Sequence, residues 1–277
     1  MNTAGKRDLD GTGEPILELI DIETRFGPKV VHDGISLRVR RGEIFALVGG
    51  SGSGKSMLMR EAVMLHVPTA GRVRLFGEDV THLGEIKSLP VRRRVGVMFQ
   101  YGALFGDMTV LENVGMPLRE HTTLDRGLIA ELSGIKLSLS GLDPRVGSMY
   151  PSEISGGMRK RAAMARAIAL DPELLVLDEP GSGLDPVSAA ALDDLIRSLR
   201  DLLGLTIVMI THDMSSVRRI SDRAAFLGDA KLLAEGTWSQ LALSDDPRVR
   251  EFFVERGAQP DHNDSAAEAD SPRKDGK

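Results

Sequence analysis

Cysteine is absent from this chain of 277 residues, so disulfides, thiolate metal sites and a cysteine nucleophile are excluded. Long apolar runs are also missing. The longest, residues 44–48 and 206–210, are the size of strands, whereas a bilayer-spanning helix needs about 18–20 residues. The first fifteen residues, MNTAGKRDLDGTGEP, contain no apolar stretch of a secretory signal. These absences predict a soluble chain of a reducing compartment, the cytoplasm.

A positive charge excess is missing as well. The chain holds 35 Lys and Arg against 40 Asp and Glu, which gives a net charge of −5. General nucleic-acid binders normally carry a basic balance. The two short basic clusters, residues 92–94 and 159–161, lack interleaved aromatics, so we expect solvated faces or interface charges there. No nucleic-acid partner is therefore expected.

The two ends differ in composition from the middle. Residues 1–14 are polar and rich in glycine, and residues 257–277 contain no Val, Ile, Leu, Met or aromatic side chain. Such segments cannot bury enough apolar area to order alone. We expect solvated tails on both sides of a single domain at residues 15–256. A C-terminal tail that docks on a partner is the alternative.

Strand and helix patterns alternate through the domain. Uniformly apolar strands that alternate with helices indicate an α/β fold with a parallel sheet covered on both faces. Residues 101–166 lack apolar strand runs and predict an inserted helical subdomain. The strands are expected at 16–22, 35–39, 43–48, 73–76, 94–99, 174–177 and 205–210, and the helices at 55–65, 125–137, 158–169, 186–203 and 247–254.

One glycine-rich loop has the pattern G-x-x-x-x-G-K-S between a predicted strand and a predicted helix, the context that marks a phosphate-binding loop, or P-loop. Its glycines let successive backbone N–H groups surround the phosphates of ATP, and the helix N-terminus adds a favourable dipole. Lys55 is expected to reach the β- and γ-phosphates, and the Ser56 hydroxyl to ligate Mg²⁺. The loop residues are Gly49, Gly50, Ser51, Gly52, Ser53, Gly54, Lys55 and Ser56.

A second apolar strand, residues 174–177, ends in two carboxylates. Asp178 is placed to hold hydrated Mg²⁺. Glu179 is placed to act as the general base that polarises the attacking water. Two surface acids at a strand end are the plainer alternative, but a P-loop about 120 residues upstream favours the catalytic interpretation.

The string ISGGM at residues 154–158, followed by a basic helix, resembles the signature motif of the ATP-binding-cassette (ABC) ATPases. The resemblance covers residues 16–255. It implies a P-loop NTPase with a RecA-like parallel-sheet core, an N-terminal antiparallel β-subdomain and an inserted α-helical subdomain. It also implies that Ser155, Gly156 and Gly157 close over the γ-phosphate bound to the opposite subunit. By itself, Ser155 would be no more than a helix N-cap.

The other ABC motifs follow in order. The resemblance makes Gln100 the Q-loop glutamine, which contacts Mg²⁺ and senses the membrane partner, and places Asp185 in the D-loop that couples two sites. It makes His212 the switch histidine that contacts the γ-phosphate. Phe26 lies where the family stacks an aromatic on adenine, although a core phenylalanine is the alternative. Because each complete site needs two chains, a homodimer closed by ATP is implied.

Further strings resemble the ATPases of Mla-type, MCE-associated lipid transporters: FQYGALF at 99–105, PLREHT at 117–122 and Met158 in place of the usual glutamine. This resemblance implies a peripheral subunit on the cytoplasmic face of the inner membrane. Its partners would be an MlaE-type permease, an MCE-domain protein and a STAS-domain protein, and its cargo phospholipid or another hydrophobic molecule. Apolar residues of 101–108 would receive the permease, or else pack in the core. The alternatives are an importer ATPase for another substrate or a soluble ABC ATPase acting on nucleic acid or ribosomes.

Overall fold

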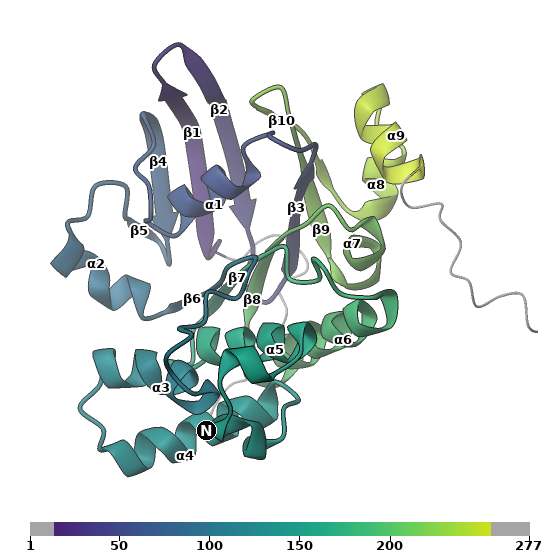
Figure 1. The fold of residues 1–277 in the computed structure, drawn as a ribbon. Helices are drawn as coiled ribbons and strands as arrows, with labels where there is room; N and C mark the ends of the chain where they lie inside the picture. The colour runs from purple at the N-terminus through teal and green to yellow at the C-terminus, as the bar shows by residue number, and fades with distance from the viewer. Residues whose placement is uncertain (1–13, 256–277) are drawn as a thin grey trace, which may run out of the picture.

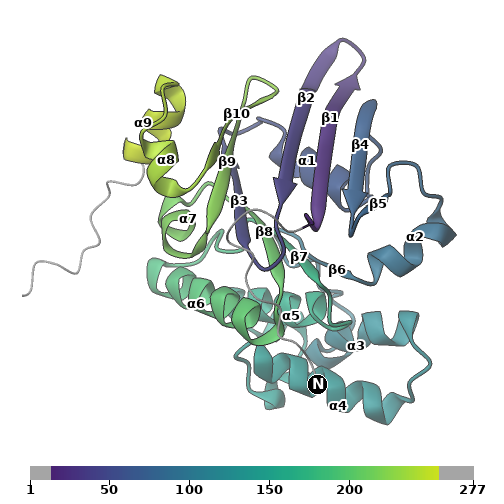
Figure 2. The same cartoon turned by 180° about the vertical axis from the view of Figure 1, so that it is seen from behind.

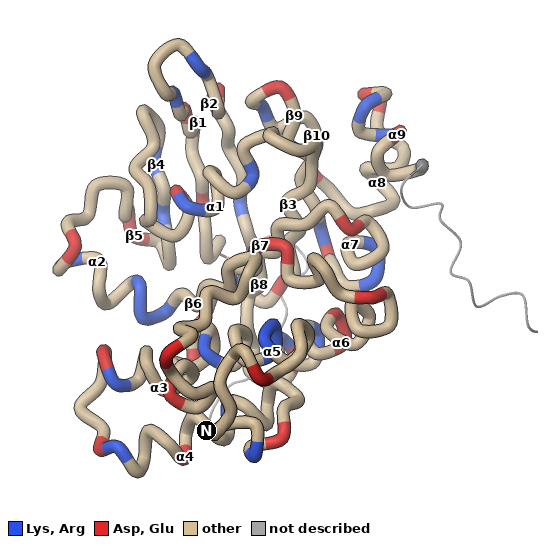
Figure 3. Tube along the Cα trace, viewed as in Figure 1, with Lys and Arg blue, Asp and Glu red and all other residues tan. Residues whose placement is uncertain are grey.

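A computed structural model describes residues 14–255 as two sheets and an attached group of helices (Figure 1). The two predicted tails, apart from residue 14, lie outside the described residues. No helix within residues 14–255 is long and apolar enough to cross a membrane. In the view of Figure 3, Lys and Arg occur beside Asp and Glu on the helices and on the strands.

The central sheet has six strands in the order β10-β9-β3-β8-β7-β6. All neighbours are parallel except β9 and β10. The three middle strands β3, β8 and β7 are buried along their whole length, as their apolar sequences predict. The bounds are β3 Ile44–Gly49, β6 Val95–Met98, β7 Leu174–Asp178, β8 Thr206–Ile210, β9 Arg223–Gly228 and β10 Lys231–Gly236.

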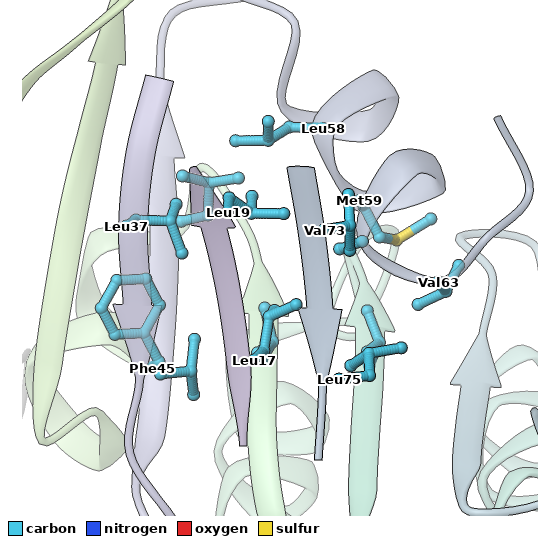
Figure 4. Close-up of a cluster of buried hydrophobic side chains, with 14 of the residues drawn as sticks. Leu17, Leu19, Leu37, Phe45, Leu58, Met59, Val63, Val73 and Leu75 are labelled. Carbon is cyan, nitrogen blue, oxygen red and sulfur yellow. The ribbon is translucent and has the colours of Figure 1, made fainter. Parts of the chain in front are cut away.

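A smaller antiparallel sheet, in the order β2-β1-β4-β5, lies beside the central one. Helix α1, Lys55–Ala62, packs between the sheets, and Figure 4 shows its Leu58 and Met59 among side chains of β1 and β4. Burial of these apolar side chains stabilises the contact by about 1.5–3 kcal/mol each. The strands are β1 Leu17–Phe26, β2 Lys29–Val39, β4 Ala70–Leu75 and β5 Glu78–Asp79, and α2, Glu85–Arg92, follows them.

The helical subdomain is formed by α3, α4 and α5, which bury a core of their own (Figures 1 and 2). Helix α5 also contributes to the second core cluster, with α6 and the central strands, so it joins the subdomain to the sheet. The bounds are α3 Val110–His121, α4 Arg126–Leu139, α5 Gly156–Ala167, α6 Pro186–Leu203, α7 Met214–Ile220, α8 Trp238–Ala242 and α9 Pro247–Glu255, with short 3-10 turns at Pro144–Ser148 and Pro151–Glu153.

Each predicted strand overlaps an observed one, but two strands of the central sheet were not predicted. Strand β9 has the sequence RAAFLG and β10 has KLLAEG. Strand β10 is not a uniform apolar run, because it is antiparallel and lies at the sheet edge. Residues 224–227 of β9 are apolar and buried, so this strand was missed although its pattern is that of a buried strand. Strand β2 begins six residues before the predicted start, since it pairs with the whole length of β1.

Candidate nucleotide site

The glycine-rich loop connects β3 to α1. Gly49 has φ +149°, and a Cβ there would lie 2.2 Å from the carbonyl oxygen of Leu227 on β9. No other residue fits, so the neighbouring strand fixes the position of the loop's first residue. Gly54 ends the loop as the N-cap of α1, with φ +96° and no side-chain cap. The first N–H groups of α1 are therefore free to bind an anion.

Lys55 folds back over this loop. Its Nζ donates to the carbonyl oxygens of Gly49 at 2.9 Å and Gly50 at 2.8 Å, and to Ser53 Oγ at 3.3 Å. Burial lowers the pKa of the Lys55 ammonium, and the negative charges of Glu179 and Asp178 oppose that shift. The cation is thus held where a phosphate on the loop would meet it.

Asp178 is the last residue of β7 and is buried. Its Oδ1 has no hydrogen-bond partner among the described residues. Burial raises the pKa of this carboxyl, and the charge of Glu179 raises it further. A buried oxygen without a donor fits a hard cation such as Mg²⁺, which prefers oxygen ligands. Ser56, in the first turn of α1, is exposed and can supply a hydroxyl oxygen.

Glu179 and His212 meet at the adjacent ends of β7 and β8. His212 Nδ1 lies 2.8 Å from Glu179 Oε2, and the side chains are 65% and 14% exposed. Glu179 has a left-handed backbone conformation, with φ +49°, and its backbone N–H donates to the carbonyl oxygen of Ile210 at 2.8 Å. Parallel pairing of β7 with β8 therefore brings together a carboxylate and an imidazole that are 33 positions apart.

Lys160 is a site residue for which the expectation of a solvated side chain is wrong. It is buried, not solvated, and its Nζ donates to the carbonyl oxygen of Gln100 and, at 3.1 Å, to that of Glu179. Burial lowers the pKa of this ammonium. The inward face of α5 carries it between the segment after β6 and the end of β7. Its neighbours Arg159 and Arg161 also bond to backbone carbonyls instead of standing free.

The signature segment starts α5. Ser155 is the N-cap, and its Oγ accepts from the N–H of Met158 at 3.2 Å, while Gly156 opens the helix. Gly157 faces the segment before α6, because a Cβ on it would lie 3.8 Å from Leu184 Cδ2. Asp185 caps α6 through the N–H groups of Val187 and Ser188. Helices α1 and α5 lie on different subdomains in both views, so the fold does not bring the signature onto the loop of its own chain (Figures 1 and 2).

Phe26 lies at the end of β1 and is 47% exposed, with its ring 5.6 Å from that of His66. The structure therefore does not support the alternative of a core phenylalanine. An exposed ring at this position can stack on a flat ligand.

A parallel sheet that carries a P-loop and an acidic strand end at the same edge, with an inserted helical subdomain, defines a P-loop ATPase of the ABC type. The family model described as ABC transporter matches residues 32–182. The chain belongs to the ABC transporter family, as its motifs predicted. It is the ATP-hydrolysing subunit of a transporter, and its fold class is confirmed.

Known relatives place it within that family, as an ABC ATPase of the Mla type. It is 41% identical to the intermembrane phospholipid transport system ATP-binding protein MlaF of Haemophilus influenzae, over 86% of this chain and 90% of that one. It is 37% identical to the probable ribonucleotide transport ATP-binding protein mkl of Mycobacterium tuberculosis, over 86% of this chain and 66% of that one. Among solved structures, the dimeric ATP-binding cassette MJ0796 with ADP and phosphate matches at a TM-score of 0.74 and 27% identity, covering 80% of this chain and 98% of that one.

Proposed function

We propose that this chain is the ATPase of a system that moves phospholipid between membranes, acting from the cytoplasmic face of the inner membrane. The observation that carries the proposal is the 41% identity to the phospholipid-transport protein MlaF over 90% of its length. The strings FQYGALF, PLREHT and SGGM support the same branch.

In the proposed site, the backbone of Gly49, Gly50, Ser51, Gly52, Ser53 and Gly54 surrounds the phosphates of ATP. Lys55 leaves two loop carbonyls to pair with the β- and γ-phosphates, and Phe26 stacks on adenine. The carbonyl bonds support this role, because they hold a partly desolvated ammonium beside the loop without neutralising its charge.

Mg²⁺ would be held by Ser56, Asp178 and Gln100, and it would supply charge stabilisation at the γ-phosphoryl group. The Oδ1 atom of Asp178, which has no hydrogen-bond partner within residues 14–255, supports this assignment. Glu179 takes a proton from water as the water oxygen attacks the γ-phosphorus, and the bond from that phosphorus to the ADP oxygen breaks. His212 holds the Glu179 carboxylate and turns its exposed ring to the γ-phosphate.

Two copies of the chain would complete each site. Ser155, Gly156 and Gly157 of one copy would face the γ-phosphate bound to the other, and Asp185 would couple the two sites. The separation of α1 from α5 supports this arrangement, because no single chain assembles both halves (Figures 1 and 2). ATP then joins the copies and hydrolysis releases them, which is the mechanical step.

The proposed partners are an MlaE-type permease, an MCE-domain protein and a STAS-domain protein. The segment after Gln100 supports a permease contact. Tyr101 is 86% exposed and Phe105 is 43% exposed, while Arg166 donates to the carbonyl oxygens of Gly102 and Ala103 and holds the segment in shape. Exposed aromatics on a braced loop are suited to receive an apolar helix.

Affinity purification of the tagged full-length chain from membranes, with mass spectrometry of co-purifying chains, tests the proposal. An MCE-domain protein and an MlaE-type permease are expected, and their loss from a Tyr101→Ala/Phe105→Ala variant would locate the contact. Co-purification of ribosomal or DNA-repair proteins in their place would contradict the proposal. The likeness to a ribonucleotide-transport ATPase makes nucleotide cargo the second candidate, and lipid analysis of the purified complex distinguishes the two.

A further inference from the structure

Three buried polar side chains meet directly beneath the P-loop. His32 on β2, Thr24 on β1 and Glu61 on α1 are each at most 1% exposed. His32 Nδ1 lies 3.0 Å from Thr24 Oγ1 and 3.1 Å from Glu61 Oε2, and Thr24 Oγ1 donates to Glu61 Oε1 at 2.5 Å. The other ring nitrogen, Nε2, lies 3.2 Å from the carbonyl oxygen of Gly54.

One ring proton of His32 follows from its partner. A carbonyl oxygen can only accept, so Nε2 carries a proton that it donates to Gly54. On the other side of the ring, Nδ1 lies within hydrogen-bond distance of Thr24 Oγ1 and close to Glu61 Oε2. Thr24 and Glu61 therefore fix the orientation of the ring, and with it the direction of the Nε2–H bond.

The carbonyl that His32 holds belongs to the peptide unit that joins Gly54 to Lys55. This unit is planar and trans, so its C=O and its N–H point in opposite directions. The Gly54 oxygen also accepts the N–H groups of Met57 and Leu58, both at 2.9 Å. With the oxygen fixed toward His32 and the helix, the Lys55 N–H points the other way, out of the N-terminus of α1.

Glycine at position 54 is required by this contact as well as by its φ of +96°. A Cβ there would lie 2.6 Å from His32 Nε2. The arrangement is costly to build, since burying polar side chains costs free energy that hydrogen bonds only partly offset, and Glu61 Oε2 has no hydrogen-bond partner among the described residues. Stability by itself therefore does not account for three buried polar side chains at the end of the P-loop.

We propose that His32 is a positioning residue of the nucleotide site: held by Glu61 and Thr24, it orients the Gly54–Lys55 peptide so that the Lys55 N–H binds phosphate. The inference rests on the proposed role of residues 49–56. His32 pairs across the sheet with Thr24, two residues before Phe26, so the same contact joins the adenine side of the site to its phosphate side.

Two double variants separate this role from a structural one. His32→Leu/Glu61→Leu removes both buried polar side chains and with them the donor to Gly54. His32→Gln/Glu61→Leu removes the same two side chains but supplies an amide N–H that can reach the Gly54 oxygen. With the full-length chain and Mg-ATP, we expect the first variant to raise the Kd about tenfold and the second to stay within about threefold of wild type. In both, kcat at saturating ATP should change by less than about threefold.

The control is Leu241→Ala, which removes a buried side chain of α8 away from the site and lowers stability without changing the Kd. Wild-type affinity in the Leu/Leu variant, or equal weakening in both double variants, would overturn the role of His32. Lys55→Ala keeps the two proposals apart. Wild-type affinity in that variant contradicts the P-loop itself, whereas a failure confined to the His32 variants contradicts only this inference.

If the double variants do not fold, a measurement on the wild-type chain tests the role of His32. In ¹⁵N NMR of the full-length chain, we expect the Nε2–H group of His32 to be present and protected from exchange. The Nε2–H resonance should shift when ATP is added. A neutral imidazole without a proton on Nε2, or a resonance that ATP leaves unchanged, would contradict the proposal.

Discussion

The two halves of the nucleotide site are built differently. The P-loop half is enclosed: Gly49 is wedged against β9, Lys55 is bonded to the loop, and His212 and Glu179 are in contact. The signature half is an open helix terminus, where Ser155 makes one local cap bond and Gly156 is exposed. Parallel strands organise the first half within one chain, whereas the second has only the helix dipole to offer.

Because of this difference, ATP binding and ATP turnover should have different requirements. The P-loop half can bind nucleotide without a second copy of the chain, because β3 and α1 of one chain already place the loop N–H groups beside Lys55. A helix N-terminus with small residues gains its anion only when another molecule presents it. Binding of ATP should therefore depend on the P-loop half, whereas turnover should depend on both halves.

Glu179→Gln should produce the largest effect, in the P-loop half. Glutamine cannot take the proton from water, so turnover should fall about 10²–10⁴-fold while ATP affinity is kept. Phosphate release and ATP binding measure the two, and ATP-bound dimers should accumulate in size-exclusion chromatography. Glu173→Gln, at the opposite end of β7, is the control and should retain turnover. Unchanged hydrolysis in Glu179→Gln would remove Glu179 from the role of base.

Ser155→Arg tests the signature half. The larger, positively charged arginine side chain fills the space in front of the N-terminus of α5. Turnover should therefore fall about 10²-fold, which is comparable to the loss of a transition-state contact. The affinity of the chain for ATP should stay the same, because the P-loop half is intact. Ser152→Arg, an exposed site on the same subdomain, should change neither quantity. A large loss of ATP affinity in Ser155→Arg would mean that the two halves are not separable.

Lys55→Ala should weaken ATP binding about 10–100-fold, the range for a lost charge-assisted hydrogen bond. Equilibrium binding of a fluorescent ATP analogue measures this, with Lys87→Ala on the exposed face of α2 as the control. Wild-type affinity would contradict the P-loop assignment.

Lys160→Met should have a smaller effect, because Lys160 contacts Gln100 and Glu179 only through their backbone carbonyl oxygens. Losing its bonds to Gln100 and Glu179 should lower kcat about fivefold and leave KM nearly unchanged, since one net hydrogen bond is worth about 1 kcal/mol. The matched control is Lys136→Met, which removes another buried lysine, paired with Asp171 in the helical subdomain. Equal kinetic losses in both variants would point to stability instead of positioning.

Asp193→Asn should have the smallest effect, on stability alone, because it lies outside both halves. Burial raises the pKa of Asp193 from 3.8 to about 6. The folded chain thus prefers the protonated carboxyl, and this contribution to stability is full below pH 3.8 and lost as the pH rises through about 6. Asparagine cannot ionise, so urea unfolding should find the variant more stable by about 1–3 kcal/mol at pH 7.5.

The same variant should lose this advantage at pH 4. Urea unfolding at the two pH values checks the sign as well as the size. An advantage that does not change with pH would contradict the raised pKa of Asp193.

Local sequence predicted the parts of the site that depend on short segments. The loop before Lys55, the acidic end of β7 and the cap at Ser155 each follow from a few adjacent residues, and each lies where its pattern indicated. The partners of Lys160 and His32 could not be predicted in this way, because they lie 8 to 60 positions away in the sequence and several of them are backbone carbonyl oxygens. The one available sign was Glu61, a carboxylate three positions after Leu58 on the buried face of α1.

By itself, the sequence of this chain without cysteine or a long apolar run determined which chemical groups are present and their order along the chain. Strand pairing and burial decided which of them meet. Only the register of β7 with β8 places His212 on Glu179, and only the packing of α1 under β1 and β2 buries His32 with Glu61. The physical reason is that sequence patterns record local backbone preferences, whereas a buried polar group takes its partner from whichever segment the core brings to it.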